Sequence, residues 1–420
     1  MSDIAKLLGA QGLSVFAFRA FQILFAWLAL DGSESGRYLA LVIALSWLVN
    51  LFAFPAAGAS VDKFGGKLVL TSAVLLSFFA VLIFWVDRSL LGAHQLVGAL
   101  ALIAMSIADC VVSIAPNSMI PLAAPSEDIT RFVGYAASVN SCQAIVGAVI
   151  GGSVMALLGP NKALCLLLVM FGIASIAAAS LRLRTPVTAS KVVELNRSGP
   201  EWSRGFLALK TIIPERSFCI LSVVINFVLT PLVSIVVPVY IRLILNAPIG
   251  YLAAAEISLG CGMLAGTFVA PRLLKFGTTR LRVLITGSVL LAGCISGVTF
   301  LAAPWLQAVA LGLIGCGVAF NNISCGSLRG HATPDSIRGR LESAVFTCCV
   351  ASIPAGSWVF GHFVSGSNVH YLGWATGISG LAIISVQLLL LLSRPTVAAL
   401  TTPDQDLAGY YEKLFPTAFR

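Results

Sequence analysis

The chain alternates between long apolar runs and short polar segments. The apolar runs are about 20 residues long, which is the length that crosses a bilayer as a helix, and glycines, prolines and charged residues bound them. Six lie in the first half, at 9–30, 38–60, 68–86, 94–116, 131–158 and 162–181. Six more follow, at 218–241, 249–270, 281–302, 305–327, 341–364 and 371–393. The pattern therefore predicts an all-α membrane protein with twelve transmembrane helices.

One long polar segment, residues 182–217, separates the two sets of runs. It carries seven of the 26 Lys and Arg residues and lacks an apolar run of spanning length. We therefore predict a six-helix bundle over 1–181, a cytoplasmic linker over 182–217, a second six-helix bundle over 218–393 and a cytoplasmic tail over 394–420.

Composition makes the bilayer the solvent of this chain. The 420 residues are 58% hydrophobic and 10% charged, with a mean hydropathy of +0.96, and a single soluble core cannot hide that much apolar surface. The net charge of +9 does not indicate nucleic acid, because the basic residues lie in short segments between apolar runs with no aromatic interleaving.

The basic residues also orient the chain. With a cytoplasmic N-terminus, 21 Lys and Arg residues fall in cytoplasmic segments, 4 fall outside and Arg19 lies within a helix. The positive-inside rule expects this bias, and the inverted topology would reverse it. We expect a multi-pass protein of the bacterial inner membrane with both termini cytoplasmic.

Sequence signals for metal, redox or ATP chemistry are missing. The ten cysteines lie in apolar runs without C-x-x-C spacing, the four histidines lie at predicted helix ends or in loops, and no P-loop is present. We expect no metal, no cofactor and no enzymatic activity. Energy then has to come from an ion gradient, another subunit or the substrate's own gradient.

Residues of the first half recur in the second at an offset close to half the chain length. Gly58 matches Gly266 at an offset of 208. At an offset of 209, four pairs match: Pro125 with Pro334, Arg131 with Arg340, Gly147 with Gly356, and Gly152 with Gly361. We infer two pseudo-symmetric six-helix halves. Parallel repeats with a site near the bilayer midplane are a transporter architecture.

Three kinds of stretch resemble signatures of the major facilitator superfamily, and the likeness extends over nearly the full chain. Residues 58–67, GASVDKFGGK, resemble its loop 2-3 signature G-x-x-x-D-R-x-G-R-[RK], with Lys63 and Gly66 in place of two arginines. Residues 147–152, GAVIGG, resemble the antiporter signature that ends G-P-x-x-G-G, with Ala148 in place of the proline. Loops 124–131 and 333–340 resemble the macrolide-efflux branch of the drug:proton antiporters, which includes the enterobactin exporter.

The resemblance implies the major facilitator fold and transport by alternating access. It implies proton-coupled export of a small amphipathic molecule, either a drug or a siderophore. It also implies a cytoplasmic gate that uses Gly58, Asp62, Gly65, Lys67, Arg131 and Arg340. Gly147, Gly151 and Gly152 are predicted helix-packing residues, since small side chains let helices approach closely; whether they also serve coupling stays open.

Three ionisable residues lie inside predicted helices: Arg19, Asp109 and Glu256. Each would cost roughly 2.5 to 3.5 kcal/mol if it faced lipid at the helix centre, so we expect all three to face protein or a water-filled cavity. Asp109 and Glu256 are alternative proton-coupling residues. Arg19 either binds substrate or forms a structural pair with Asp109.

The predicted substrate-binding residues are Arg19, Gln22, Asn140 and Gln143. Gln22 lies one turn after Arg19, and the two amide residues share a face of the fifth predicted helix. The expected partners are a small-molecule substrate, protons and the lipid bilayer, and we expect a monomer. The alternatives are a transporter of lysophospholipid or another lipid without obligatory proton coupling, a membrane-bound enzyme, and a sensor that does not transport.

Overall fold

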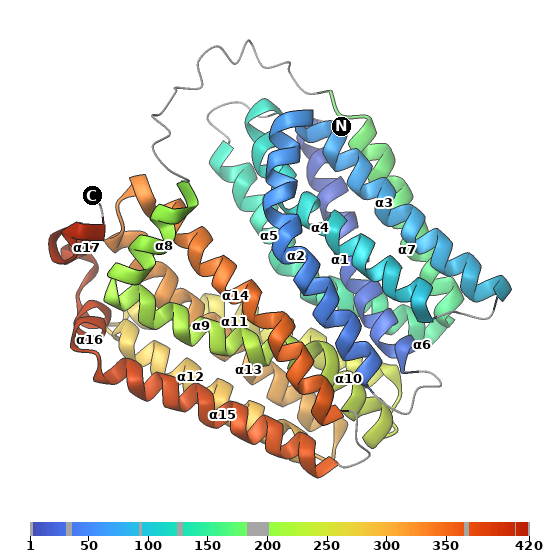
Figure 1. The fold of residues 1–420 in the computed structure, drawn as a ribbon. Coiled ribbons are helices and arrows are strands. Elements are labelled where there is room, and N and C mark those ends of the chain that lie inside the picture. The colour runs from blue at the N-terminus through green and yellow to red at the C-terminus, as the bar shows by residue number, and fades with distance from the viewer. Residues whose placement is uncertain are drawn as a thin grey trace. The chain divides into compact units, whose positions relative to one another are not determined.

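The computed structural model describes residues 3–30, 36–91, 95–123, 129–182, 201–364, 369–407 and 409–418. Within these ranges the regular structure is helical and includes no strand (Figure 1). Eleven helices are long and apolar enough to span a membrane, and a twelfth span, 134–158, is bent by 41° at a break. The predicted all-α fold with twelve spans is therefore confirmed.

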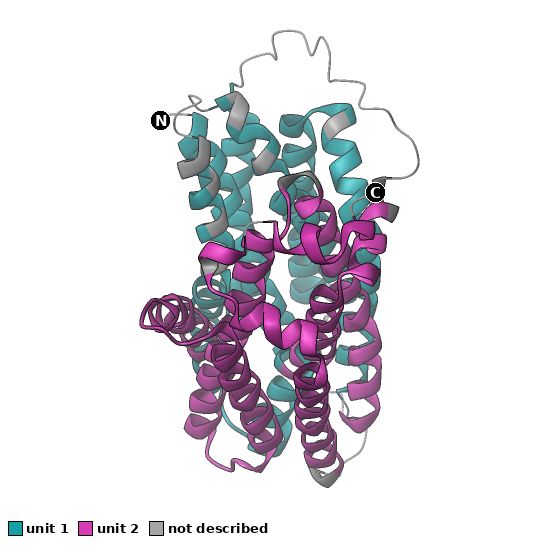
Figure 2. Cartoon of the chain, turned by 90° about the vertical axis from the view of Figure 1, so that its left-hand side faces the viewer, with its two compact units in different colours: residues 1–190, 233–257 teal, residues 191–232, 258–420 magenta. Residues whose placement is uncertain are grey.

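The chain divides into two compact units, which are coloured separately in Figure 2. Unit 1 comprises residues 1–190 and 233–257, and unit 2 comprises residues 191–232 and 258–420. Unit 1 thus includes the second half of the seventh span and the start of the eighth. The predicted domain boundaries stay a prediction.

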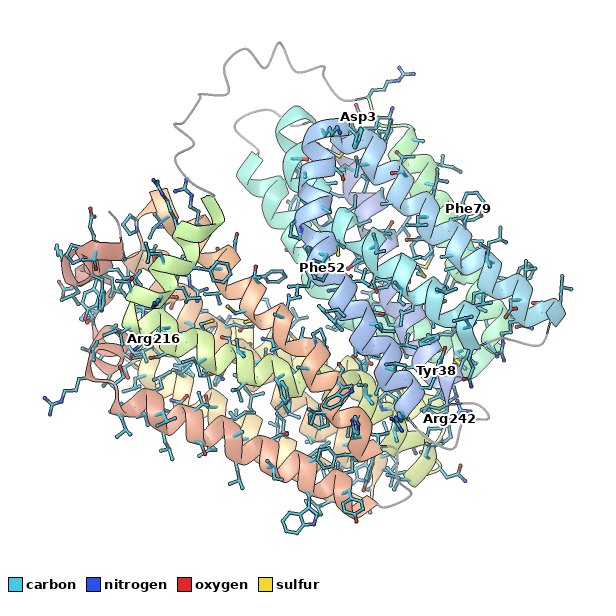
Figure 3. All side chains as sticks on the ribbon, in the orientation of Figure 1. Asp3, Tyr38, Phe52, Phe79, Arg216 and Arg242 are labelled. Atoms are coloured by element: carbon cyan, nitrogen blue, oxygen red, sulfur yellow. The ribbon has the colours of Figure 1, made fainter. Side chains whose placement is uncertain are left out.

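Unit 1 is built around α1 (Asp3–Ala29), which packs against α4, α5 and α7. Its other helices are α2 (Arg37–Phe64), α3 (Gly66–Val86), α4 (Gln95–Ala123), α5 (Ile129–Ala148), α6 (Val154–Leu158), α7 (Pro160–Ala179), α10 (Val237–Val239) and the first part of α11 (Ile249–Lys275). Phe21 of α1 is fully buried, whereas Phe79 of α3 is half exposed and is labelled in Figure 3. Outward-facing apolar side chains are expected here, because lipid tails are as apolar as the side chains themselves.

Unit 2 contains two packed groups of spans, α12 with α13 and α15, and α9 with α14. The bounds of its elements are α8 (Glu201–Thr211), α9 (Ile213–Pro231), the rest of α11, α12 (Arg280–Gly297), α13 (Pro304–Ala332), α14 (Asp335–Val364), α15 (Val369–Leu392), α16 (Arg394–Thr401) and α17 (Tyr410–Leu414). Ser288, Asn321 and Gln387 form a buried polar contact among α12, α13 and α15.

The same contact between two helices occurs in both units. In unit 1, Gly147 of α5 lies against Arg19 of α1, 128 residues earlier; in unit 2, Gly356 of α14 lies against Phe227 of α9, 129 residues earlier. The two glycines are the pair that the sequence offset of 209 aligned. A Cβ on either residue would overlap the neighbouring helix. In each half, a glycine at this position therefore lets the first and fifth spans approach closely.

The polar segments contain more structure than their sequence pattern indicates. Helix α8 forms inside the predicted linker, and α9 begins at Ile213, five residues before the predicted run at 218. The tail folds into α16 and α17, with Tyr411 fully buried. In the fifth span, a π-helical turn, η3 (Val149–Ser153), interrupts the predicted continuous helix.

Candidate functional site

An ion pair between α1 and α11 forms the centre of the candidate site. The Arg19 guanidinium donates a hydrogen bond from Nη2 to Oε2 of Glu256, and both residues belong to unit 1. The Glu256 side chain is only 4% exposed and that of Arg19 is 18% exposed. Arg19 Nη1 also donates to Gln22 Oε1 at 3.0 Å. Three of the predicted site residues are therefore in one hydrogen-bonded group.

Three glycines of the fifth span bring the two charged helices together. A Cβ on Gly147 would overlap the stem of Arg19, and a Cβ on Gly151 would overlap the backbone of Ala20. Gly152 lies equally close to Ala253, one turn before Glu256 on α11. Because none of the three has a side chain, α1 and α11 can both pack on this span. The glycines thus form the surface that aligns Arg19 with Glu256.

The predicted amide residues lie on the same span, toward its first half. Gln11 of α1 donates from Nε2 to Oδ1 of Asn140 at 3.1 Å and to the carbonyl of Ala136 at 3.3 Å. Oε1 of Gln11 and Oγ of Ser14 are buried and find no hydrogen-bond partner among the described residues. Gln143 is half-buried one turn after Asn140. This part of the α1 and α5 interface therefore contains buried polar atoms that form no hydrogen bond with a described residue.

Asp109 lies apart from this group, on α4 beside a polar contact to α2. Cys110 Sγ donates to the Ser106 carbonyl at 3.3 Å, and the Asn50 side-chain amide nitrogen donates to the carbonyls of Ser46 and Ser106 at 3.3 Å each. The Asp109 side chain is partly buried and forms no hydrogen bond or ion pair with another described residue. The structural pair of Arg19 with Asp109 is not formed, because Glu256 and Gln22 take the guanidinium instead.

The structure describes four of the six predicted gating residues in full, namely Gly58, Gly65, Lys67 and Arg340. Gly65 joins α2 to α3 with φ of 85°, a left-handed conformation that favours glycine. Gly58 has nothing within 4 Å of the position of a Cβ, and Lys67 is exposed. Arg340 is half-buried near the start of α14, where its backbone carbonyl lies against Gly205 of α8. The side chains of Asp62 and Arg131 lie outside the described part of the chain.

Glycine at position 66, where the family signature has arginine, has a local explanation. A Cβ on Gly66 would lie 2.6 Å from Cγ of Met119 on α4. A larger residue would require the Met119 side chain or the start of α3 to move. The departure from the signature therefore accompanies a close contact between α3 and α4.

Unit 2 contains a buried charged cluster that sequence reasoning missed. Arg329 Nε donates to Glu215 Oε2 at 2.7 Å, and the Tyr411 hydroxyl donates to Oε1 of the same carboxylate at 3.0 Å. Glu215 and Tyr411 are fully buried. Burial and the neighbouring Glu215 carboxylate raise the pKa of Tyr411 well above its ordinary value of 10. The cluster joins α9, α13 and the tail helix α17.

The available signal for this cluster was weak. Glu215 lies in the segment predicted to be a linker, Arg329 belongs to the predicted cytoplasmic cations, and the tail has no apolar run of spanning length. An acidic residue directly before an apolar run, as in Pro214-Glu215, was the one indication. For metals, the described residues hold no group of three or more His, Cys, Asp or Glu side chains that could bind an ion.

Comparison with known proteins adds the family. The model of the Major Facilitator Superfamily matches residues 7–357. Among solved structures, a D-xylose-proton symporter is similar at 14% identity with a TM-score of 0.69, over 96% of this chain and 98% of that one. The nucleoside transporter NupG is similar at 15% identity with a TM-score of 0.68, over 91% and 99% of the two chains.

A bacterial homologue of the human lysosomal transporter Spinster, in an inward-facing and unoccupied conformation, is similar at 10% identity with a TM-score of 0.69, over 99% of this chain and 97% of that one. No curated protein matches the sequence. Identities this low show the shared fold alone, but the family match extends over most of the chain. The chain belongs to the major facilitator superfamily, whose members are transporters that work by alternating access and are not enzymes.

Proposed function

We propose that this transporter exports a small amphipathic organic molecule, a drug or a siderophore, in exchange for protons. The observation that carries the proposal is the buried pair of Arg19 and Glu256 inside unit 1. A buried ion pair is weak evidence for stability, because removing two charges from water costs about as much as their attraction returns. A functional role accounts better for its presence inside a spanning helix.

The chemistry follows from the two protonation states of Glu256. In the ionised state, its carboxylate accepts from Arg19, and the guanidinium is neutralised. When Glu256 takes up a proton, Arg19 loses its counter-charge and keeps only Gln22 as a partner in this group. Arginine stays charged at any physiological pH. A hydroxyl or amine donor of the substrate binds the Glu256 carboxylate only in its ionised state, so uptake of the proton releases the substrate and the two alternate at one site.

Gln11, Asn140 and Gln143 extend this site along α1 and α5. The unsatisfied oxygens of Gln11 and Ser14 supply acceptor atoms beside Asn140. Their uncharged polarity suits hydroxyl or amide groups of an organic molecule. We assign these residues to the polar part of the substrate.

Energy from one proton suffices for this exchange. One charge that moves through about 100 mV releases about 2.3 kcal/mol. At about 1.4 kcal/mol per tenfold ratio, this sustains a roughly forty-fold substrate gradient. The D-xylose-proton symporter, by its description, couples transport to protons on the same fold.

Cytoplasmic gating is proposed for the loop between α2 and α3 and for the two matching segments at the starts of α5 and α14. Gly65 provides the turn, and Lys67 is exposed next to it. Arg131 and Arg340 begin the fifth and eleventh spans at matching positions. We assign Gly58 and Asp62 to the same gate on the strength of the family signature.

Transport in proteoliposomes with an imposed pH gradient tests the coupling site. We expect Glu256→Gln to abolish gradient-driven uptake and to keep passive exchange of substrate, because the glutamine cannot carry a proton. Asp109→Asn is the matched variant at the other intramembrane carboxyl, and it should retain driven transport. A reversed result would move the coupling role to Asp109. Undiminished driven transport by both variants would reject both assignments.

The same assay addresses the lipid alternative. A transporter of lysophospholipid without obligatory coupling would keep its full rate after an uncoupler collapses the proton gradient. We expect the rate of the wild-type chain to fall to that of Glu256→Gln. Persistence of the full rate would contradict proton-coupled export.

A further inference from the structure

Unit 2 contains an apolar cavity that the proposed transport chemistry does not use. It has a volume of about 460 Å³ and lies among α9, α14 and α15. Phe227 and Val228 line it from α9, Phe360 lines it from α14, and Ala375, Ser379 and Ala382 line it from α15. The size is that of a ligand site, for which about 300 to 1,000 Å³ is usual.

Small residues on α15 create the space. Ala375, Ser379 and Ala382 recur at helical spacing and share one face. Such faces normally let two helices close on each other, and α9 and α14 do so at Gly356 and Phe227. Here α15 leaves a cavity in front of its small residues instead.

The lining of the cavity has no polar group that needs a water molecule as a hydrogen-bond partner. Ser379 is the one polar residue of its lining, and its hydroxyl donates to the Ala375 carbonyl of its own helix at 2.7 Å. An apolar cavity of this kind stays dry and takes apolar ligands. Ile378, which also lines it, is 58% exposed, so the cavity opens onto the outer surface of the helices.

Exposed aromatic residues fix the depth of the cavity in the membrane. Phe300, Trp305, Trp358, Tyr371 and Trp374 are each more than half exposed. All lie near the ends of α12 to α15 that are opposite to the basic residues Arg280, Arg329, Arg340 and Arg394. Exposed Trp and Tyr at one end of a bundle mark the level of the lipid headgroups. Ile378 and Ala382 follow Trp374 by one and two turns, about 6 and 12 Å deeper.

We infer that this cavity binds one acyl chain of a membrane phospholipid from the leaflet that borders the aromatic residues. The headgroup lies at the level of Trp358 and Trp374, and the chain enters past Ile378 and packs against Phe227 and Phe360. The amphipathic substrate is a poorer occupant, because the lining offers no free polar atom for its polar part. An acyl chain is shielded from water equally well in the bilayer and in the cavity. What favours the cavity is van der Waals contact of the acyl chain with the cavity wall.

Photolabelling of the full-length protein in nanodiscs tests the inference. The probe is a phospholipid that carries a diazirine in its acyl chain, and labelled peptides are mapped by mass spectrometry. In the wild-type chain, we expect adducts on Val228 and Phe360, which are each only 2% exposed and can be reached from the cavity alone. Ser379→Phe fills the cavity and should remove these adducts. Leu381→Phe, on the exposed face of the same helix, should keep them.

A milder variant and a second photoreactive probe complete the experiment. Ser379→Leu, a milder filling, should lower labelling at Val228 and Phe360 if Ser379→Phe fails to fold. Adducts confined to outward-facing residues, or equal labelling of filled and control variants, would overturn the inference. Labelling of these two residues by a photoreactive drug-like amphiphile, with none by the phospholipid, would overturn it too. The readout needs no transport, so it is independent of the coupling test at Glu256.

Discussion

At the level of single residues, two buried carboxylates among the described residues are each paired with an arginine. Arg19 meets Glu256 in unit 1, and Arg329 meets Glu215 in unit 2. The second pair has an additional donor, Tyr411, so both oxygens of the Glu215 carboxylate are occupied. A fully satisfied buried carboxylate holds its surroundings in one arrangement, because any loss leaves an unpaired acceptor.

Tyr411→Phe is expected to destabilise the protein by about 1 to 3 kcal/mol, because Oε1 of Glu215 then loses its donor inside the protein. Denaturant unfolding in detergent measures the change. Tyr410→Phe is the control, since the hydroxyl of Tyr410, the preceding residue, forms no hydrogen bond with any residue that the structure describes. Equal stability of the two variants would show that the hydroxyl of Tyr411 contributes nothing.

The pH dependence of this difference has a definite sign. The pKa of Tyr411 is raised on folding by burial and by Glu215. Its contribution is therefore complete below the unfolded pKa of about 10 and is lost as the pH rises through the folded value. We expect the stability advantage of the wild-type chain over Tyr411→Phe to shrink above pH 10. A constant difference from pH 8 to pH 11 would contradict this assignment.

The sequence identified the intramembrane charges but not how they pair. Arg19, Asp109 and Glu256 stand out in any count of polar residues within apolar runs. The partner of Arg19 lies 237 residues away, and two carboxylates were available. Which one meets the guanidinium depends on the rotation and depth of α1, α4 and α11. Those quantities are set by packing and are not encoded in residue spacing.

At the scale of elements, close helix contacts depend on the absence of a side chain. Gly151 faces the backbone of Ala20, which cannot move aside as a flexible side chain can. Gly134, on the same span, has nothing within 4 Å of a Cβ and is exposed. Glycine to alanine can therefore be compared at a tightly packed position, Gly151, and at an exposed position, Gly134, of the same span.

Gly151→Ala is expected to cost about 1 to 3 kcal/mol, because the methyl group overpacks the contact between α5 and α1. It should also lower proton-driven transport, since it displaces the helix that carries Arg19. Gly134→Ala is expected to be neutral or to gain up to about 1 kcal/mol from helix propensity. Denaturant unfolding and the proteoliposome assay measure both effects. Indifference to Gly151→Ala would mean that α5 does not align the charged pair.

Apolar periodicity predicted the elements that lie in lipid, and it failed where helices lie outside it. Eleven of the twelve predicted runs coincide with helices that are long and apolar enough to span a membrane, and the run at 131–158 coincides with the bent pair 134–140 and 142–158. Helix α8 and the tail helices α16 and α17 were not predicted, because their apolar residues are few and pack against other helices of unit 2. The π-helical turn at Val149–Ser153 was also invisible, since a change of one residue per turn leaves hydrophobicity unaltered.

At the scale of the whole molecule, the two halves share a construction rule that the sequence offset disclosed. Gly147 and Gly356 occupy equivalent positions and bring equivalent spans together. What differs between the halves is chemical. The contact in unit 1 lies beside the Arg19 and Glu256 pair, whereas the contact in unit 2 lies beside an apolar cavity. One half thus supplies the charges proposed for coupling, and the other supplies a surface proposed for lipid.

The orientation of the chain in the membrane is the prediction on which the side of the proposed gate and the leaflet of the proposed lipid site both depend. Reporter domains test the orientation when they are inserted before and after α12, because the single helix between the two sites places them on opposite sides of the membrane. With 21 basic residues predicted inside and 4 outside, alkaline phosphatase inserted after Gly277 should be inactive, and the same domain inserted after Ala303 should be active. Green fluorescent protein at these two positions should give the opposite pattern, because it fluoresces only where it folds in the cytoplasm. The reverse result with both reporters would invert the molecule, place the proposed gate on the other side of the membrane and move the proposed lipid site to the other leaflet.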